Sequence, residues 1–187
     1  MHPYSAGYSR LMKHPLLASL AFVLGSFLAA GAAHALEVGQ PVPDFTLQGS
    51  DGKTYRRADF VGKQGFVFAW FPRAFTPGCT AELGSLRDGA DAIDDFDAAV
   101  FMVSTDPPEK NAEFAKSLGA KHVLLSDVDG SVAEAFGVAG SGGLFAQRWT
   151  FYVDEKGVIR AIDSSVDSGN AGPDIARKLG ELGFPRK

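Results

Sequence analysis

Apolar and polar residues follow one another along the chain in blocks that predict alternating strands and helices. Residues 65–71 and 98–104 are almost continuously apolar, which is typical of strands that are buried on both faces of a sheet. Residues 122–126 form a shorter run of the same kind. Between the first two runs, apolar residues recur at spacings of three and four, which predicts an amphipathic helix with an apolar face of Leu83, Leu86, Ala90 and Ile93.

Shorter patterns predict the remaining elements. Residues 44–47 alternate like a strand, residues 50–53 form a hairpin turn, and residues 54–60 return as a strand that leads into a short turn of helix. Further helices are predicted over residues 107–118, 131–136 and 173–182, and a closing hairpin over residues 148–153 and 158–162. This order predicts an α/β fold over residues 36–187, a single domain whose mixed central sheet is flanked by helices on both faces.

The first 35 residues carry a targeting pattern. Arg10 and Lys13 precede an apolar stretch over residues 16–28, and Ala33-His34-Ala35 follows as an A-x-A cleavage pattern. We therefore predict a signal peptide over residues 1–35, cleaved after Ala35, and export to the periplasm. The alternative is an uncleaved membrane anchor, for which the apolar stretch is short. Met12 is a second candidate start, because it would give a more compact leader.

Composition and charge narrow the possible partners. The chain has 187 residues, of which 45% are hydrophobic, as expected of a globular protein with a core. Removing the leader, which holds two basic residues and no acidic one, takes the formal charge from −4 to about −6. This acidity argues against nucleic acid as a partner. Cleavage of the leader would leave no stable membrane association.

The sequence contains one cysteine, Cys79. It lies between a strand pattern that Pro72 ends and a helical pattern, so we place it at a helix N-terminus, where backbone N–H groups and the helix dipole favour the thiolate. With no second cysteine, an intramolecular disulfide and a C-x-x-C dithiol site are both impossible. The sulfur is either a nucleophile or a packed apolar group.

Other kinds of site find little support. The chain lacks the ligands of a zinc or haem site, and His122 is the only histidine after the leader, which makes a Cys–His hydrolase a poor fit. Asp127, Asp129 and Gly130 lack the full spacing of a calcium loop and predict a turn with a helix cap.

The segment from Pro72 to Cys79, with Thr76 three residues before the cysteine, resembles the active-site signature of peroxiredoxins of the AhpC/TSA superfamily, thiol peroxidases with a thioredoxin-like fold. Glu82 and Arg148 resemble that family's motif glutamate and strand-borne arginine. Residues 71–80 are most similar to the PrxQ or bacterioferritin comigratory protein branch, and the resemblance spans residues 37–185. Gly84 stands where many members of that branch carry a resolving cysteine, so the chain resembles a one-Cys member.

The resemblance implies a peroxidase that needs neither a cofactor nor a metal and reduces hydrogen peroxide, organic hydroperoxides or both. Cys79 would become a sulfenic acid, and an external thiol, from a thioredoxin-like protein or a small molecule, would regenerate it. Thr76 is expected to contact the thiolate and the peroxide, and Arg148 to hold the peroxide oxygens. Pro72 is expected to shield the pocket from water, and Glu82 to orient Arg148. Gly78 is expected to offer a backbone N–H group.

Each assignment has a plainer structural alternative. Instead of serving a site, Thr76 could cap the helix and Glu82 could interact with the helix dipole. Arg148 could be a surface charge. Arg87 is expected in a surface ion pair, and four aromatic residues are expected in the core or a pocket wall: Trp70, Phe71, Phe75 and Trp149. For the whole protein, the alternative is a thioredoxin-fold binding or holdase module without peroxidase activity. Monomer and homodimer both remain open.

Overall fold

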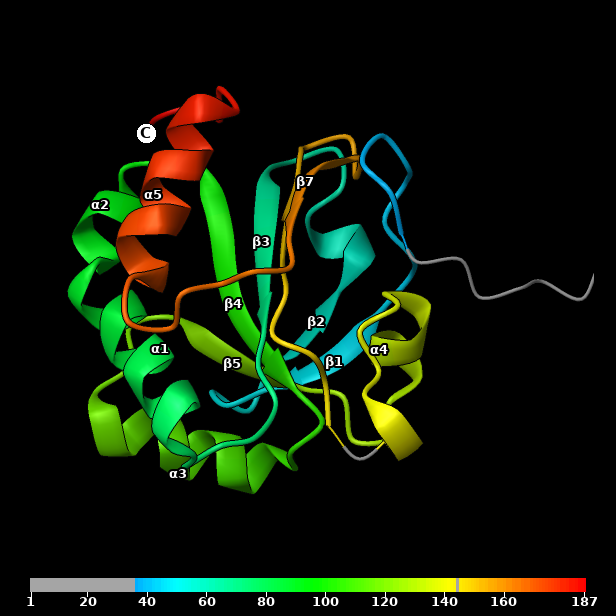
Figure 1. Cartoon of the computed structure of the whole chain (residues 1–187). Coiled ribbons are helices and arrows are strands. Elements are labelled where there is room, and N and C mark those ends of the chain that lie inside the picture. The colour runs from blue at the N-terminus through cyan, green and yellow to red at the C-terminus, as the bar shows by residue number, and fades with distance from the viewer. Residues whose placement is uncertain (1–35, 144) are drawn as a thin grey trace, which may run out of the picture. The chain divides into compact units, whose positions relative to one another are not determined.

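The computed structural model describes residues 36–143 and 145–187 (Figure 1). The predicted signal peptide over residues 1–35 lies outside the described residues. Within the described ranges, no helix combines the length and the apolar character needed to cross a membrane.

The described strands form one seven-stranded sheet in the order β2-β1-β5-β4-β3-β6-β7. Their bounds are β1 (Thr46–Gly49), β2 (Thr54–Arg56), β3 (Gly65–Trp70), β4 (Ala98–Ser104), β5 (Val123–Ser126), β6 (Thr150–Val153) and β7 (Ile159–Asp163). Strands β3, β4 and β5 are parallel, whereas β6 runs antiparallel to β3. The carboxyl ends of the three parallel strands and the beginning of β6 therefore meet at one edge of the sheet, which confirms the predicted mixed sheet.

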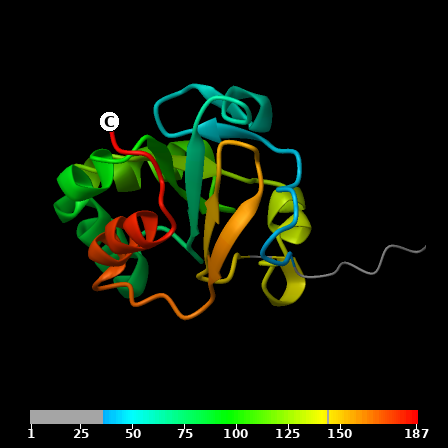
Figure 2. The same cartoon turned by 90° about the horizontal axis from the view of Figure 1, so that it is seen from above.

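Helices cover both faces of the sheet. They are α1 (Pro77–Asp88), α2 (Ala90–Asp94), α3 (Pro108–Leu118), α4 (Ser131–Ala135) and α5 (Ala171–Glu181), with short 3-10 turns η1 (Arg57–Asp59) and η2 (Ser141–Gly143). Figures 1 and 2 show α1, α2, α3 and α5 on one side of the strands and α4 on the other.

Strand β3 is buried on both faces, as its sequence predicts. Phe66, Phe68 and Trp70 belong to the apolar cluster beneath α4, and Val67 and Ala69 belong to the cluster beneath α1 and α5. All six residues of β3 are buried. Because successive side chains of a strand point to opposite faces, one uninterrupted apolar run supplies two cores. The strand is thereby fixed in place, and so is the chain that leaves its carboxyl end.

Several boundaries differ from the predicted ones. The helix expected to reach Ile93 is interrupted at Gly89, where a Cβ would lie only 3.0 Å from the Gly172 carbonyl carbon, so α1 and α5 approach each other closely at this point. The first strand runs over β1 rather than residues 44–47, because its partner β5 pairs with Gln48 and Gly49. Strand β6 begins at Thr150 rather than at Arg148, and α5 begins two residues before Pro173.

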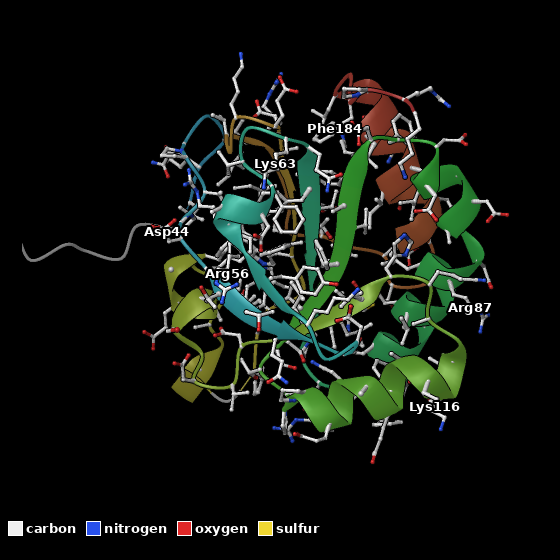
Figure 3. All side chains as sticks on the ribbon, turned by 180° about the vertical axis from the view of Figure 1, so that it is seen from behind. Asp44, Arg56, Lys63, Arg87, Lys116 and Phe184 are labelled. Carbon is white, nitrogen blue, oxygen red and sulfur yellow. The ribbon has the colours of Figure 1, made fainter. Side chains whose placement is uncertain are left out.

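Arg87 forms a surface ion pair, as predicted. Its Nε lies 2.7 Å from Asp88 Oδ1, and its Nη1 donates to the Leu118 carbonyl oxygen at 3.1 Å. Figure 3 shows Arg87 on α1 and Lys116 on α3, both on the outer side of the helices. The contact with Leu118 also ties α1 to the end of α3.

Candidate active site

Cys79 lies in the first turn of α1, just beyond the carboxyl end of β3. Its side chain is fully buried. The Phe71 N–H group, which follows β3, donates to the Val103 carbonyl oxygen at 2.9 Å and extends the pairing with β4 by one residue. Pro72 cannot donate a hydrogen bond of this kind, so the chain leaves the sheet there and turns into the helix. The predicted position of the cysteine at a helix N-terminus is confirmed.

A tight turn connects Pro72 with α1. Within it Phe75 has a φ of 67°, and it is the only non-glycine residue with positive φ among the described residues. A bulky side chain in this backbone region is strained, and such strain is typical of functional sites. Phe75 is also 50% exposed, with its ring 5.0 Å from that of Phe114, so of the two predicted places, the core or a pocket wall, the core is excluded. Trp70 and Phe71 are fully buried, as predicted.

Thr76 occupies the N-cap position of α1, with Pro77 as the first helical residue. Its carbonyl oxygen accepts the first helical bond from the Thr80 N–H at 2.9 Å. Its hydroxyl does not cap the helix and instead donates to the Arg73 carbonyl oxygen at 3.0 Å. The hydroxyl proton is therefore engaged, whereas the lone pairs of Oγ1 can still accept a hydrogen bond.

Arg148 reaches the cysteine from the segment that leads into β6. Its Nη2 lies 3.4 Å from Cys79 Sγ, and its Nη1 donates to Glu82 Oε2 in an ion pair. Glu82 is fully buried, whereas the Arg148 side chain is 21% exposed. The segment carrying Arg148 is fixed on both sides, because the Gln147 N–H donates to the Val138 carbonyl oxygen and the Trp149 carbonyl oxygen accepts the Trp70 N–H. The structure thus brings together Cys79, Glu82 and Arg148.

Gly78 leaves room for this guanidinium. A Cβ at position 78 would lie 3.1 Å from Arg148 Nη2, which is closer than ordinary van der Waals contact. The residue before the cysteine therefore has a steric reason to be glycine, in addition to the backbone N–H group that it places at the helix N-terminus.

Charge and burial oppose each other at Glu82. Burial favours its neutral form and Arg148 favours its carboxylate, and burial prevails, so that the pKa of Glu82 rises to about 7. Its Oε1 has no hydrogen-bond partner within the described part of the chain. Partial burial disfavours the charge of Arg148, but Glu82 and Cys79 more than compensate and raise the pKa of Arg148 above its usual value.

Comparison with known proteins identifies the family. The sequence pattern of the AhpC/TSA family matches residues 38–162. Peroxiredoxin Bcp of Escherichia coli (strain K12) is 34% identical over 141 residues, covering 72% of this chain and 90% of that protein. The chain belongs to the AhpC/TSA family.

Two further relatives agree with this assignment. Alkyl hydroperoxide reductase E of Mycobacterium tuberculosis (strain CDC 1551 / Oshkosh) is 35% identical over 127 residues, covering 67% of this chain and 83% of that protein. The crystal structure of peroxidoxin BcpB from Mycobacterium tuberculosis matches with a TM-score of 0.71 and 31% identity, covering 79% of this chain and 98% of that one. The protein is a peroxiredoxin with a thioredoxin-like fold, and hence a thiol-dependent peroxidase.

Two other candidate groups from the sequence, His122 and Asp127, make contacts of their own. His122 Nε2 lies 3.5 Å from Asp94 Oδ1, and burial lowers the pKa of this histidine. Asp127 accepts the N–H groups of Val132 and Ala133, so the predicted helix cap is confirmed at the beginning of α4. Among the described residues, no group of three or more His, Cys, Asp or Glu side chains is arranged to hold a metal ion.

Sequence reasoning missed one residue that contacts the site. Asp106 Oδ2 accepts the Ala74 N–H at 2.7 Å, inside the turn that precedes Cys79. The available signal was positional, because Asp106 follows β4, whose carboxyl end lies at the same edge of the sheet as that of β3.

Proposed function

We propose that Cys79 is the residue that attacks the peroxide, and that Arg148 and Glu82 activate it. The observation that supports this assignment is the 3.4 Å distance between Arg148 Nη2 and Cys79 Sγ. A guanidinium at this distance stabilises a thiolate, and so do the unpaired N–H groups at the beginning of α1. A thiolate is the form of cysteine that reacts as a nucleophile.

The first step forms an S–O bond and breaks the O–O bond. The Cys79 thiolate attacks one oxygen of the hydroperoxide and donates an electron pair, and the other oxygen leaves with the bonding electrons and takes up a proton. The products are water or an alcohol and a sulfenic acid on Cys79. Arg148 stabilises the negative charge that develops on the leaving oxygen, and Glu82 keeps the guanidinium in place.

The residues of the turn position the peroxide. Because the Thr76 hydroxyl donates to the Arg73 carbonyl oxygen, its free lone pairs can accept the hydrogen of the peroxide O–H group. Pro72 shields the sulfur from water, and Gly78 offers its backbone N–H group at the helix N-terminus. Thr76 is the N-cap residue of α1 and Gly78 lies in its first turn, whereas Pro72 lies where the chain leaves β3.

An external thiol completes the cycle. Since the sequence contains no second cysteine, the sulfenic acid condenses with a thiol from outside, which releases water and forms a mixed disulfide. A second thiol attacks this disulfide, restores Cys79 and leaves as the oxidised disulfide. The reductant is a thioredoxin-like protein or a small thiol, and the catalytic unit is a monomer or a homodimer.

Two observations bear on the substrate and the location. One relative is named an alkyl hydroperoxide reductase, and the exposed ring of Phe75 places an apolar surface beside the turn, so organic hydroperoxides are candidate substrates together with hydrogen peroxide. The leader pattern of residues 1–35 supports export to the periplasm, and Edman sequencing of the secreted protein would reveal cleavage after Ala35.

Steady-state kinetics with varied peroxide and varied thiol test this function. The proposed cycle predicts parallel lines in double-reciprocal plots, as in any ping-pong reaction. Hydrogen peroxide and an alkyl hydroperoxide should be compared with dithiothreitol and with a thioredoxin system as reductants. Intersecting lines, or consumption of peroxide that persists in Cys79→Ser, would contradict the cycle. A binding or holdase module would show no consumption above that of the thiol alone.

A further inference from the structure

A buried carboxylate outside the expected site, that of Asp106, accepts a hydrogen bond from the turn that leads to Cys79. Asp106 is 8% exposed and lies just beyond β4. Its Oδ2 accepts the backbone N–H of Ala74 at 2.7 Å, across 32 positions of sequence. The turn and α1 lie beside α3, the helix that follows Asp106 (Figure 1).

Asp106 is itself fixed by its neighbours. Its Oδ1 accepts a hydrogen bond from Lys110 Nζ at 2.6 Å in an ion pair, and its backbone N–H donates to Ser104 Oγ at 3.2 Å. Asn111, which is fully buried, donates from its Nδ2 to Ser104 Oγ at 3.1 Å and to Ser126 Oγ at 2.9 Å. The carboxylate is therefore part of a polar network that joins the ends of β4 and β5 to α3.

The turn needs such an anchor because it contains strain. Phe75 follows Ala74 directly and has a φ of 67°. A bulky residue persists in this backbone region only where the surrounding structure holds it there. The Arg73 carbonyl oxygen and the Thr76 hydroxyl close the turn from within, and the Ala74 N–H is the point at which a side chain from the segment after β4 holds it. Thr76 and Cys79 follow immediately.

We propose that Asp106 is a positioning residue for peroxide reduction, because its bond to the Ala74 N–H sets where Thr76 and Cys79 stand against Arg148. This inference rests on the proposed role of Cys79. Asp106 acts through the backbone and does not touch the substrate. Positioning requires that the Asp106 side chain offer an acceptor oxygen to the Ala74 N–H, whereas its negative charge is needed only for the ion pair with Lys110.

Four variants separate these possibilities. Asp106→Ala removes the acceptor, Asp106→Asn keeps an acceptor oxygen without the charge, and Lys110→Met removes the ion pair alone. The matched control is Asp154→Ala. Asp154 accepts two backbone N–H groups, of Lys156 and Val158, in the turn after β6. That turn lies at the amino end of β3, because Val153 pairs with Phe66, so the control is at the far end of the sheet from Cys79.

The measurement is the second-order rate constant for oxidation of Cys79 by hydrogen peroxide in a single turnover, with urea unfolding to report stability. We expect Asp106→Ala to react about 10- to 100-fold more slowly than the wild type, because small displacements of reacting groups cost that much. Asp106→Asn, Lys110→Met and Asp154→Ala should stay within about threefold of the wild type. A rate constant restored in Asp106→Asn would show that the acceptor oxygen is what the reaction needs. If Asp106 only stabilised the fold through its charge, Asp106→Asn would not restore the rate.

Two results would overturn the inference: a rate constant in Asp106→Ala no lower than in Asp154→Ala, or an Asp106→Asn variant as slow as Asp106→Ala. Should Asp106→Ala not fold, Asp106→Glu replaces it, since it keeps the charge and displaces the acceptor. The inference then requires a slower reaction in Asp106→Glu and fails if the rate is that of the wild type. If Cys79 of the wild type does not react with peroxide, the proposed function fails. If both the wild type and Asp106→Ala react rapidly, only the inference about Asp106 fails.

Discussion

Arg148 Nη2 lies 3.4 Å from Cys79 Sγ, although 69 positions separate the two residues along the chain. The contact follows from the pairing of β3 with β6, in which Ala69 lies opposite Thr150. The helix that carries the cysteine begins shortly after β3, and the arginine immediately precedes β6. The two residues therefore meet at the edge of the sheet where one strand ends and its antiparallel neighbour begins.

Replacing this arginine should slow the attack on peroxide. We expect Arg148→Met to lower the rate constant for oxidation of Cys79 by hydrogen peroxide about 10²- to 10³-fold, the usual loss for one donor that stabilises a developing negative charge. Stopped-flow fluorescence, read through Trp70 and Trp149, measures this rate. Arg160→Met is the control, because Arg160 pairs with Asp154 at the other end of the sheet. An unchanged rate in Arg148→Met would remove the arginine from the site.

Gly78 provides a steric test of the same contact. Gly78→Ala puts a Cβ 3.1 Å from Arg148 Nη2, so the guanidinium must shift and the rate should fall about 3- to 10-fold. Gly84→Ala in the same helix is the matched control, since a Cβ there meets no atom within 4 Å. The control should raise the free energy of unfolding by about 0.5–1 kcal/mol and leave the rate unchanged. Equal rates in both variants would show that the space at position 78 is not needed.

The buried carboxyl of Glu82 should make stability depend on pH. Burial raises the pKa of Glu82 from 4.5 to about 7, so the folded protein holds a proton that the unfolded chain releases between these values. This contribution to the free energy of unfolding is complete below pH 4.5 and is lost as the pH rises through 7. Between pH 5 and pH 8, the stability of the wild type relative to Glu82→Gln should fall by about 2–3 kcal/mol.

Urea unfolding of both proteins at each pH measures this difference, and groups common to the two cancel. A difference that grows as the pH rises would mean that the ion pair with Arg148 outweighs burial, in conflict with the raised pKa of Glu82.

The sequence predicted the sheet better than it predicted the turns. The apolar runs of β3 and β4 are legible because a strand buried on both faces excludes polar side chains. The break at Gly89 was not predicted, and the close contact of this glycine with α5, which comes from a distant part of the chain, leaves no local pattern. The register of β1 likewise depends on pairing with β5, which no local pattern encodes.

The sequence named three residues that the structure brings together, Cys79, Glu82 and Arg148, but it did not predict their geometry. The resemblance around Cys79 named Glu82 and Arg148, yet the distance between the guanidinium and the sulfur depends on strand pairing. Phe75 was expected in the core or a pocket wall because it is apolar, and neither its positive φ nor its exposure is displayed by the sequence. Asp106 was missed because an acidic residue before Pro107 resembles an ordinary turn.

The most direct test of the account is a single-turnover reaction of the protein with one equivalent of hydrogen peroxide, followed by dimedone and mass spectrometry. We predict rapid and stoichiometric oxidation, with the dimedone adduct on the peptide that contains Cys79 and no adduct in Cys79→Ser. Full catalytic turnover should then require added thiol. Two results would contradict the central claim. Cys79 could remain reduced and unlabelled, or it could be oxidised no faster than a free thiol such as glutathione.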